Sequence, residues 1–157
     1  MNHTSRSFKK RPPRLARIYD NTPLYFVTCC THDRRPLLAS EAVHDVFRGA
    51  AERVSSAGNA VGRYVIMPDH IHMFLRIRAN GSLGAVVKCI REAITRCLHR
   101  DKPDLRVWQA GFFDHLMRSG ESYAEKWLYV SNNPVRAGLC PAADKWPYQG
   151  EIVEIRW

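Results

Sequence analysis

Two histidines separated by one residue, His70 and His72, have the type and spacing to do chemistry. In an extended strand successive side chains point to opposite faces, so both imidazoles would project from one face and Ile71 and Met73 from the other. Two neutral imidazoles can bind a divalent cation, and a third ligand from elsewhere would leave positions open for substrate and water. A hydrogen-bonded histidine pair on a strand surface has the same spacing, so the motif alone leaves both interpretations open.

A second group of polar side chains follows Ser122. Ser122 and Glu125 have capping-box spacing, which predicts that a helix begins there. Pro134 limits its length, because the residue before a proline is biased out of the helical region. If the helix persists through Asn133, Tyr129 shares one face with Asn133, and Glu125 shares one with Tyr129. A tyrosine hydroxyl and an amide or carboxylate oxygen would then face the sheet together. An ordinary tyrosine that packs a helix on a sheet is the alternative.

The elements that must position these groups follow from the apolar pattern. Short aromatic and β-branched runs predict strands over residues 24–31, 61–67 and 70–77, and a fourth strand or extended segment over 106–113. Helical spacing of apolar residues predicts two helices, which Ser40 and Ser82 can cap. The order strand, helix, strand, strand, helix, strand indicates an α+β fold, with a ferredoxin-like antiparallel sheet (βαββαβ) and helices on one face.

The two middle strands are separated only by Pro68 and Asp69, which predicts a tight hairpin although the dipeptide is not the favoured Asn-Gly type. Along the second strand the aliphatic side chains share one face, and the histidines share the other with Phe74 and Arg76. If the two helices cover the aliphatic face, the histidine face is left free for chemistry or for another covering element.

Length and composition set the limits. A chain of 157 residues fits one domain with one core. Its 24 Lys and Arg exceed its 15 Asp and Glu, giving a formal charge of +9, which favours nucleic acid as the partner class. Five cysteines without a Cys-x-x-Cys pair indicate a reduced, cytoplasmic setting. No apolar run is long enough to span a membrane, and the N-terminus lacks the apolar stretch of a signal peptide.

We divide the chain into a basic N-terminal arm (residues 1–23) and one catalytic domain (24–140) with a C-terminal extension of the same domain (141–157). The arm carries arginines that can neutralise phosphates, among them Arg11, Arg14 and Arg17. A solvated tail is the alternative for this segment.

Four segments, taken together and in order, resemble the REP-associated tyrosine transposases of the wider IS200-like, single-tyrosine group of His-hydrophobic-His nucleases. They are Tyr25-Phe-Val-Thr28, Met67-Pro-Asp-His-Ile-His72, Val107-Trp-Gln109 with Phe113-Asp-His115, and Tyr129-Val-Ser-Asn-Asn-Pro-Val-Arg-Ala-Gly-Leu139. The resemblance covers roughly residues 14–140.

The resemblance implies a ferredoxin-like core with an added C-terminal catalytic helix. It implies Mg²⁺ or Mn²⁺ bound by His70 and His72, with Asn133 as the third ligand. Glu125 or His115 could take the place of Asn133. It also implies Tyr129 as the nucleophile of a single-stranded DNA endonuclease and strand transferase acting through a 5′-phosphotyrosine. If the nucleophile is not Tyr129, Tyr123 and Tyr64 are the remaining candidates.

The implied substrate is single-stranded DNA beside a REP-type hairpin, with Arg118 and Arg136 holding phosphates together with the arm. The implied state is a monomer or a homodimer. An inert basic nucleic-acid-binding module on the same fold is the alternative function. A nucleotide hydrolase of the histidine-triad type is disfavoured, because the alternation continues into Phe74 and not into a third histidine.

Overall fold

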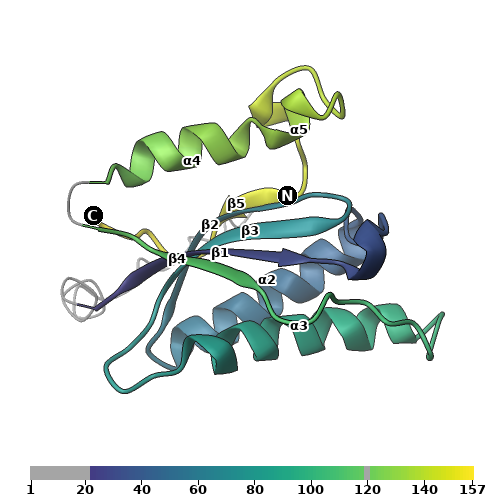
Figure 1. Cartoon of the computed structure of the whole chain (residues 1–157), viewed down its shortest axis with the longest axis horizontal. Helices are drawn as coiled ribbons and strands as arrows, with labels where there is room; N and C mark the ends of the chain where they lie inside the picture. Colours follow the sequence, from purple (N-terminus) through teal and green to yellow (C-terminus); the bar gives the residue numbers. More distant parts are fainter. Residues whose placement is uncertain (1–21, 119–120) are drawn as a thin grey trace, which may run out of the picture.

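The protein is built in three layers around one antiparallel sheet (Figure 1). The structure, a computed structural model, describes residues 22–118 and 121–157. The five strands lie in the order β4-β1-β3-β2-β5. The described elements are β1 (Leu24–Cys30), η1 (His32–Arg34), α2 (Glu41–Ser56), β2 (Ala60–Ile66), β3 (His70–Arg76), α3 (Leu83–His99), β4 (Phe113–Leu116), α4 (Tyr123–Ser131), α5 (Asn133–Arg136), η2 (Ala143–Lys145) and β5 (Gln149–Glu151).

The predicted α+β, ferredoxin-like sheet is confirmed. Four strands and the two long helices follow one another in the order β1-α2-β2-β3-α3-β4, and all strand pairs are antiparallel. Helices α2 and α3 cover one face of the sheet, and α4 lies over the other (Figure 1). The face that carries the histidines is therefore left to α4 and the short α5 that follows it.

Both long helices begin at the predicted serines. The hydroxyl oxygen of Ser40 accepts a hydrogen bond from the Val43 amide at 3.3 Å, and that of Ser82 accepts one from the Ala85 amide at 3.2 Å. After α2, Gly58 takes a φ of +100°, the left-handed conformation that suits glycine at the end of a helix. The helices bury the aliphatic face of β3 in the main core, whose largest members include Phe47, Ile71, Met73, Leu75 and Ile90.

The β2–β3 hairpin is held by a neighbouring segment. The Met67 amide donates to the His70 carbonyl at 2.8 Å, which closes a two-residue turn over Pro68 and Asp69. The carbonyls of these two turn residues accept bonds of 2.9 Å each, from the Leu38 and Thr31 amides respectively. The chain between β1 and α2 thus stabilises a turn whose sequence is not typical of tight hairpins.

Residues 106–113 are open to two predictions, a fourth strand or an extended segment, and β4 itself begins at Phe113. Within 106–112 only Trp108 makes a β-bridge, to Thr31, so this run is an extended segment. The indole nitrogen of Trp108 donates to the Arg91 carbonyl at 3.2 Å and to the Thr95 hydroxyl at 3.0 Å, and these bonds tie the extended segment to α3. Gly111, with a φ of +71°, then turns the chain into β4.

The C-terminal segment completes the histidine side of the molecule. β5 pairs with β2, and Trp146 donates its indole N–H to the Ile66 carbonyl at 2.9 Å. Ile155 packs with Phe74 and Tyr123 in a second core cluster beneath α4. Among the described helices, none is long and apolar enough to cross a membrane.

Candidate functional site

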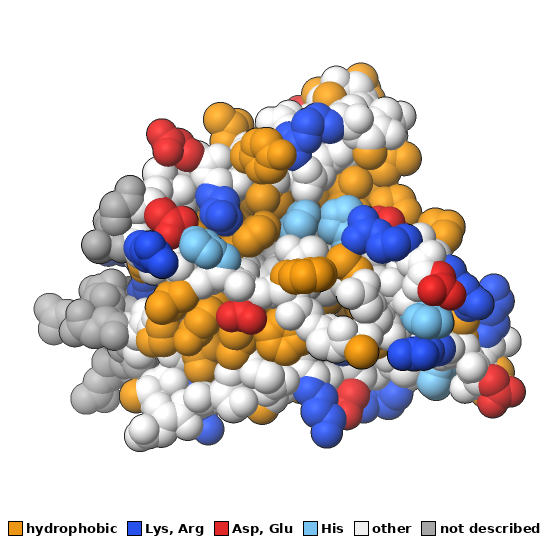
Figure 2. All heavy atoms as spheres, in the orientation of Figure 1, with side chains coloured by type: hydrophobic (Ala, Val, Ile, Leu, Met, Phe, Trp, Pro, Cys, Tyr) orange, Lys and Arg blue, Asp and Glu red, His pale blue; other side chains and the backbone are white. Residues whose placement is uncertain are grey.

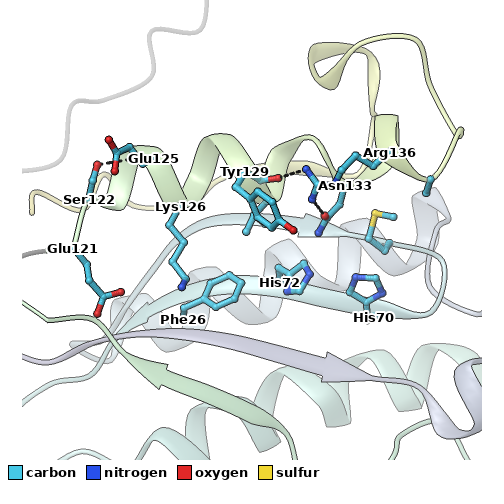
Figure 3. Close-up of a pocket in the computed structure, with 13 residues that line it drawn as sticks. Phe26, His70, His72, Glu121, Ser122, Glu125, Lys126, Tyr129, Asn133 and Arg136 are labelled. Atoms are coloured by element: carbon cyan, nitrogen blue, oxygen red, sulfur yellow. Dashed lines mark hydrogen bonds between the residues drawn. The ribbon is translucent and has the colours of Figure 1, made fainter.

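An open cleft of about 890 Å³ separates the sheet from α4 and α5. Its floor is formed by Phe26, His70 and His72, and its wall includes side chains of α4 and α5 (Figure 3). In the surface view, histidine side chains lie in a hollow below the ridge that contains α4 (Figure 2). The face that the two long helices leave uncovered is therefore the face that is hollowed.

Each of the two imidazoles in the cleft is held by a hydrogen bond at its Nδ1 atom. The Nδ1 atom of His70 lies 2.7 Å from a carboxylate oxygen of Asp69, and the Nδ1 atom of His72 lies 2.7 Å from the hydroxyl oxygen of Thr28. The ring centroids are 4.7 Å apart. These bonds leave the Nε2 atom of each ring for a ligand, which is the arrangement of metal-binding histidines supported by neighbouring carboxylates or hydroxyls.

Both histidines are held in the neutral form. Burial, and then the charges of His70, Arg34 and Arg136, lowers the pKa of His72 to about 3. Burial also lowers the pKa of His70, although Asp69 opposes the shift. A metal ion binds the neutral form of imidazole. At neutral pH neither ring therefore needs to lose a proton before it can bind a metal ion.

Arg34 fixes the carboxylate behind His70. Its Nε atom donates to Asp69 at 2.8 Å, and its Nη1 atom donates to the sulfur of Cys30 at 2.9 Å. Asp33 and Arg34 have φ angles of +53° and +54°, a conformation that residues other than glycine rarely adopt. Burial raises the pKa of Asp69, but the hydrogen bond from His70 and the nearby charges outweigh it and hold the pKa below its ordinary value.

Tyr129 lies on the other wall of the cleft and is 68% exposed. Tyr129 and Asn133 point from the helical side toward the histidines (Figure 3). Pro134 limits the helix, as the sequence predicts: α4 ends at Ser131 and the short α5 begins at Asn133. The two side chains share the cleft although they do not belong to one continuous helix.

Arg136 joins these two groups. Its guanidinium lies 4.1 Å from the centroid of the Tyr129 ring, and its Nη1 atom donates to the Tyr129 carbonyl at 2.8 Å. Its Nη2 atom donates to the side-chain oxygen of Asn133. An amide oxygen has two lone pairs, so this bond leaves Asn133 able to act as a ligand.

The other two candidate nucleophiles are buried away from the cleft. Tyr64 lies on the helix-covered face, 2% exposed, with its hydroxyl 2.8 Å from His44 Nε2. The hydroxyl of Tyr123, which is 7% exposed, accepts a bond from the Arg63 amide at 3.1 Å. Burial raises the pKa of each tyrosine to about 12.

The predicted third metal ligands are not placed alike. Asn133 and Glu125 line the cleft, whereas His115 lies on β4 with its Nε2 atom 2.9 Å from both carboxylate oxygens of Glu121. In the described part of the chain, no three His, Cys, Asp or Glu side chains come together as a metal site. Neither Glu125 nor His115 therefore forms such a group with the histidine pair in this conformation. Asn133, which lines the cleft, stays the predicted third ligand.

Two functional candidates in the cleft escaped the sequence reasoning. The ammonium of Lys126 lies 4.9 Å above the ring of Phe26, and Phe26 is stacked on His72 at 5.2 Å between centroids. Lys126 forms no salt bridge with the described carboxylates. Its position three residues before Tyr129, on the same helix face, is a signal that could have found it. The position of Phe26 opposite Phe74, next to Thr28 and His72, depends on strand register.

The predicted DNA-binding arginines fall in three places. Arg136 lines the cleft, as described above. Arg118 is exposed just after β4, where its amide donates to Glu121 at 3.0 Å. Arg11, Arg14 and Arg17 lie outside the described residues.

Comparisons with known proteins agree on one group. The model of the family described as "Transposase IS200 like" matches residues 20–132. A curated relative from Haemophilus influenzae, named as a REP-associated tyrosine transposase, is 24% identical over an alignment of 136 positions that covers 80% of this chain and 77% of the relative.

Two solved structures share the fold. One is a REP-associated tyrosine transposase bound to a REP hairpin, with a TM-score of 0.69 and 21% identity, covering 91% of this chain and 81% of the other. The second is a crystal structure of a protein described as a transposase from Deinococcus radiodurans. It has a TM-score of 0.52 and 20% identity, covering 80% of this chain and 97% of the other.

Proposed function

Because this chain belongs to the IS200-like transposase family, we propose that it cleaves and rejoins single-stranded DNA beside a hairpin, with Tyr129 as the nucleophile. The observation that carries the proposal is the placement of two imidazoles, each hydrogen-bonded at Nδ1, and of an exposed tyrosine on facing sides of one cleft. A DNA strand in this cleft could contact both. The buried states of Tyr64 and Tyr123 support Tyr129 over the other candidates.

In the proposed reaction the Tyr129 oxygen attacks the scissile phosphorus. A tyrosine–phosphorus bond forms while the bond from phosphorus to the 3′ oxygen of the preceding nucleotide breaks. The phenolic proton is lost, and the leaving 3′ oxygen gains one. The products are a 5′-phosphotyrosine and a free 3′-hydroxyl, and attack by such a hydroxyl on the phosphotyrosine rejoins strands without ATP.

His70, His72 and Asn133 would hold the divalent ion, Mg²⁺ or Mn²⁺, with Asp69 and Thr28 orienting the rings. When bound, such an ion supplies polarisation of the phosphate and stabilisation of its developing charge. Imidazole ligands suit the transition metals better than they suit Mg²⁺, so Mn²⁺ is the better match to this donor set. Arg136 and Lys126 lie in the same cleft and would contact the phosphate oxygens.

The proposed partner is single-stranded DNA with a REP-type hairpin. The solved relative is bound to a REP hairpin, and the formal charge of +9 of this chain fits a phosphate-rich partner. Exposed aromatic rings in and beside the cleft could stack on bases. A cytoplasmic location and a monomeric or homodimeric state stay predictions, and a size measurement in solution tests the latter.

The test is incubation of the protein with hairpin-bearing single-stranded DNA and Mn²⁺, followed by a denaturing gel. We expect a covalent adduct that is lost in Tyr129→Phe and in His70→Ala. His115→Ala is the matched control, because this histidine shares the sheet face but does not line the cleft. Binding without any adduct would favour the inert module. An adduct that persists in Tyr129→Phe would assign the nucleophile to another tyrosine.

A further inference from the structure

A second groove lies on the opposite side of the sheet from the cleft, between α2 and α3. It has a volume of about 530 Å³, and it is lined by Asp45, Val46, Gly49, Arg53, Ala93, Arg96, Cys97 and Arg100. Gly49 and Ala93 contribute almost no side chain, which leaves room between the two helices. The sheet and its aliphatic core separate this groove from the catalytic cleft (Figure 1).

The rim of the groove is strongly basic. Three arginines, Arg53, Arg96 and Arg100, border it together with a single acid, Asp45. All three are exposed, and none forms a salt bridge with a carboxylate in the part of the chain that the structure describes. By contrast, Arg34 and Arg63 are paired with carboxylates. The groove arginines therefore keep their donors for a ligand.

Stabilisation of the helix ends does not account for this arrangement. Arg53 and Arg96 lie in the last turns of α2 and α3, where a cation interacts favourably with the helix dipole. That effect acts on each helix separately, and it does not require the arginines of two helices to border one groove. Arg100 lies at the C-cap of α3 and adds a third guanidinium to the same rim.

The chemistry of the rim favours phosphate over a protein surface. The planar guanidinium binds phosphate oxygens through two parallel hydrogen bonds. Protein interfaces are enriched in arginine too, but together with aromatic and other large apolar anchors. The described exposed large hydrophobic residues all lie elsewhere, and none lines this groove: Phe113, Leu116, Leu128, Tyr129, Leu139 and Trp157.

We propose that this groove binds the sugar–phosphate backbone of a DNA segment other than the strand held in the catalytic cleft. The inference rests on the proposed function, because it takes DNA as the partner. The sheet lies between the cleft and the groove, so a short strand in the cleft does not contact the groove. The groove therefore engages a flanking part of a longer DNA. Contacts to phosphates add affinity without reading sequence.

The experiment compares two triple variants with the same change in charge. The groove variant is Arg53→Gln, Arg96→Gln, Arg100→Gln. The control is Arg48→Gln, Lys88→Gln, Lys102→Gln, whose residues are exposed but do not line the groove. Glutamine keeps much of the side-chain length, and thermal unfolding verifies that both variants fold. Binding is measured against salt concentration on a long hairpin-bearing DNA and on a short single strand that fills only the cleft.

For the groove variant on the long DNA, we expect the slope of log affinity against log salt to flatten by about 2 to 3, since each phosphate contact contributes roughly 0.7 to 0.9. Binding and adduct formation on the short strand should stay at the wild-type level, and the control should change the slope much less. Equal slopes for the two variants on the long DNA would overturn the groove proposal and leave the rim to an acidic protein or to solvent. If the wild-type chain neither binds these DNAs nor forms an adduct with them, the proposed function is overturned as well.

Discussion

The two faces of the sheet are built in opposite ways from the same strands. On one face, α2 and α3 bury aliphatic side chains such as Ile71 and Met73, each 1% exposed. On the other, the nine-residue α4 and the C-terminal segment leave an open cleft over His70 and His72. Residues of β3 alternate between the two faces. Those that stabilise the core and those proposed to act in the chemistry are therefore neighbours in sequence but lie on opposite sides of the sheet. Substitutions one position apart should therefore have effects of different kinds.

The largest expected effect is on the aliphatic face. Ile71→Ala removes a fully packed side chain between the two histidines and leaves a cavity, so the free energy of unfolding should fall by about 2 to 5 kcal/mol. Denaturant unfolding measures this loss. At a temperature where the variant is folded, adduct formation should persist; if it is lost while the fold is intact, the two faces are not separable.

Next comes the neighbouring position on the cleft face. His72→Ala removes one of the two proposed nitrogen ligands, and the rate of adduct formation should fall by about 100-fold or more, because metal stabilisation of the reaction is worth several kcal/mol. The free energy of unfolding should change far less than in Ile71→Ala. A large loss of stability with little loss of rate would reverse the comparison.

A smaller effect is expected for the residue behind His72. Thr28→Val keeps the shape of the side chain but removes the hydroxyl that bonds to Nδ1 at 2.7 Å. Affinity for Mn²⁺ should fall by about 10-fold to 100-fold, as for other residues that orient metal-binding histidines. Isothermal titration with Mn²⁺ measures it, and Thr28→Ser, which restores the hydroxyl, should recover most of the affinity.

The pH dependence should also distinguish the faces. The pKa of His72 is lowered to about 3 in the folded chain, so below the ordinary histidine pKa of about 6.5 the unfolded chain binds a proton that the folded chain does not. Folding stability should fall as pH drops from about 6.5 toward 3, by about 1 kcal/mol per pH unit from this residue. Wild type should therefore lose stability relative to His72→Gln as the pH falls through this range, which unfolding curves of the two proteins measure. Parallel curves would contradict the lowered pKa.

The smallest effect is expected for the cation of the cleft wall. Lys126→Gln removes a charge that lies above Phe26, and binding of a short single strand should weaken a few-fold, with a salt slope smaller by about 0.7. Filter binding over a range of salt measures both. Lys88→Gln, on the opposite face, is the control, and an equal effect of the two substitutions would mean that the cleft does not hold the strand.

The sequence predicted those parts of the molecule that local pattern determines. Alternation along β3 and the serine caps are properties of short segments, and Ser40, Ser82 and Ser122 all cap helices in the structure. The pattern of residues 106–113 could not decide between a strand and an extended segment, because the choice depends on the packing of Trp108 against α3. Lys126 and Phe26 join the cleft through the packing of α4 over the sheet and through strand register, and neither is visible in a short window.

The clamped hairpin turn has a consequence for motion. The turn that presents His70 is tied by its own carbonyls to Leu38 and Thr31, which are both fully buried. α4, which presents Tyr129, is short, and one side of it borders the open cleft. Amide hydrogens of β3 should therefore exchange with solvent only in global unfolding, whereas those of α4 should exchange through local opening. A DNA strand could then enter and leave by movement of the tyrosine side alone, while the histidine side keeps its geometry.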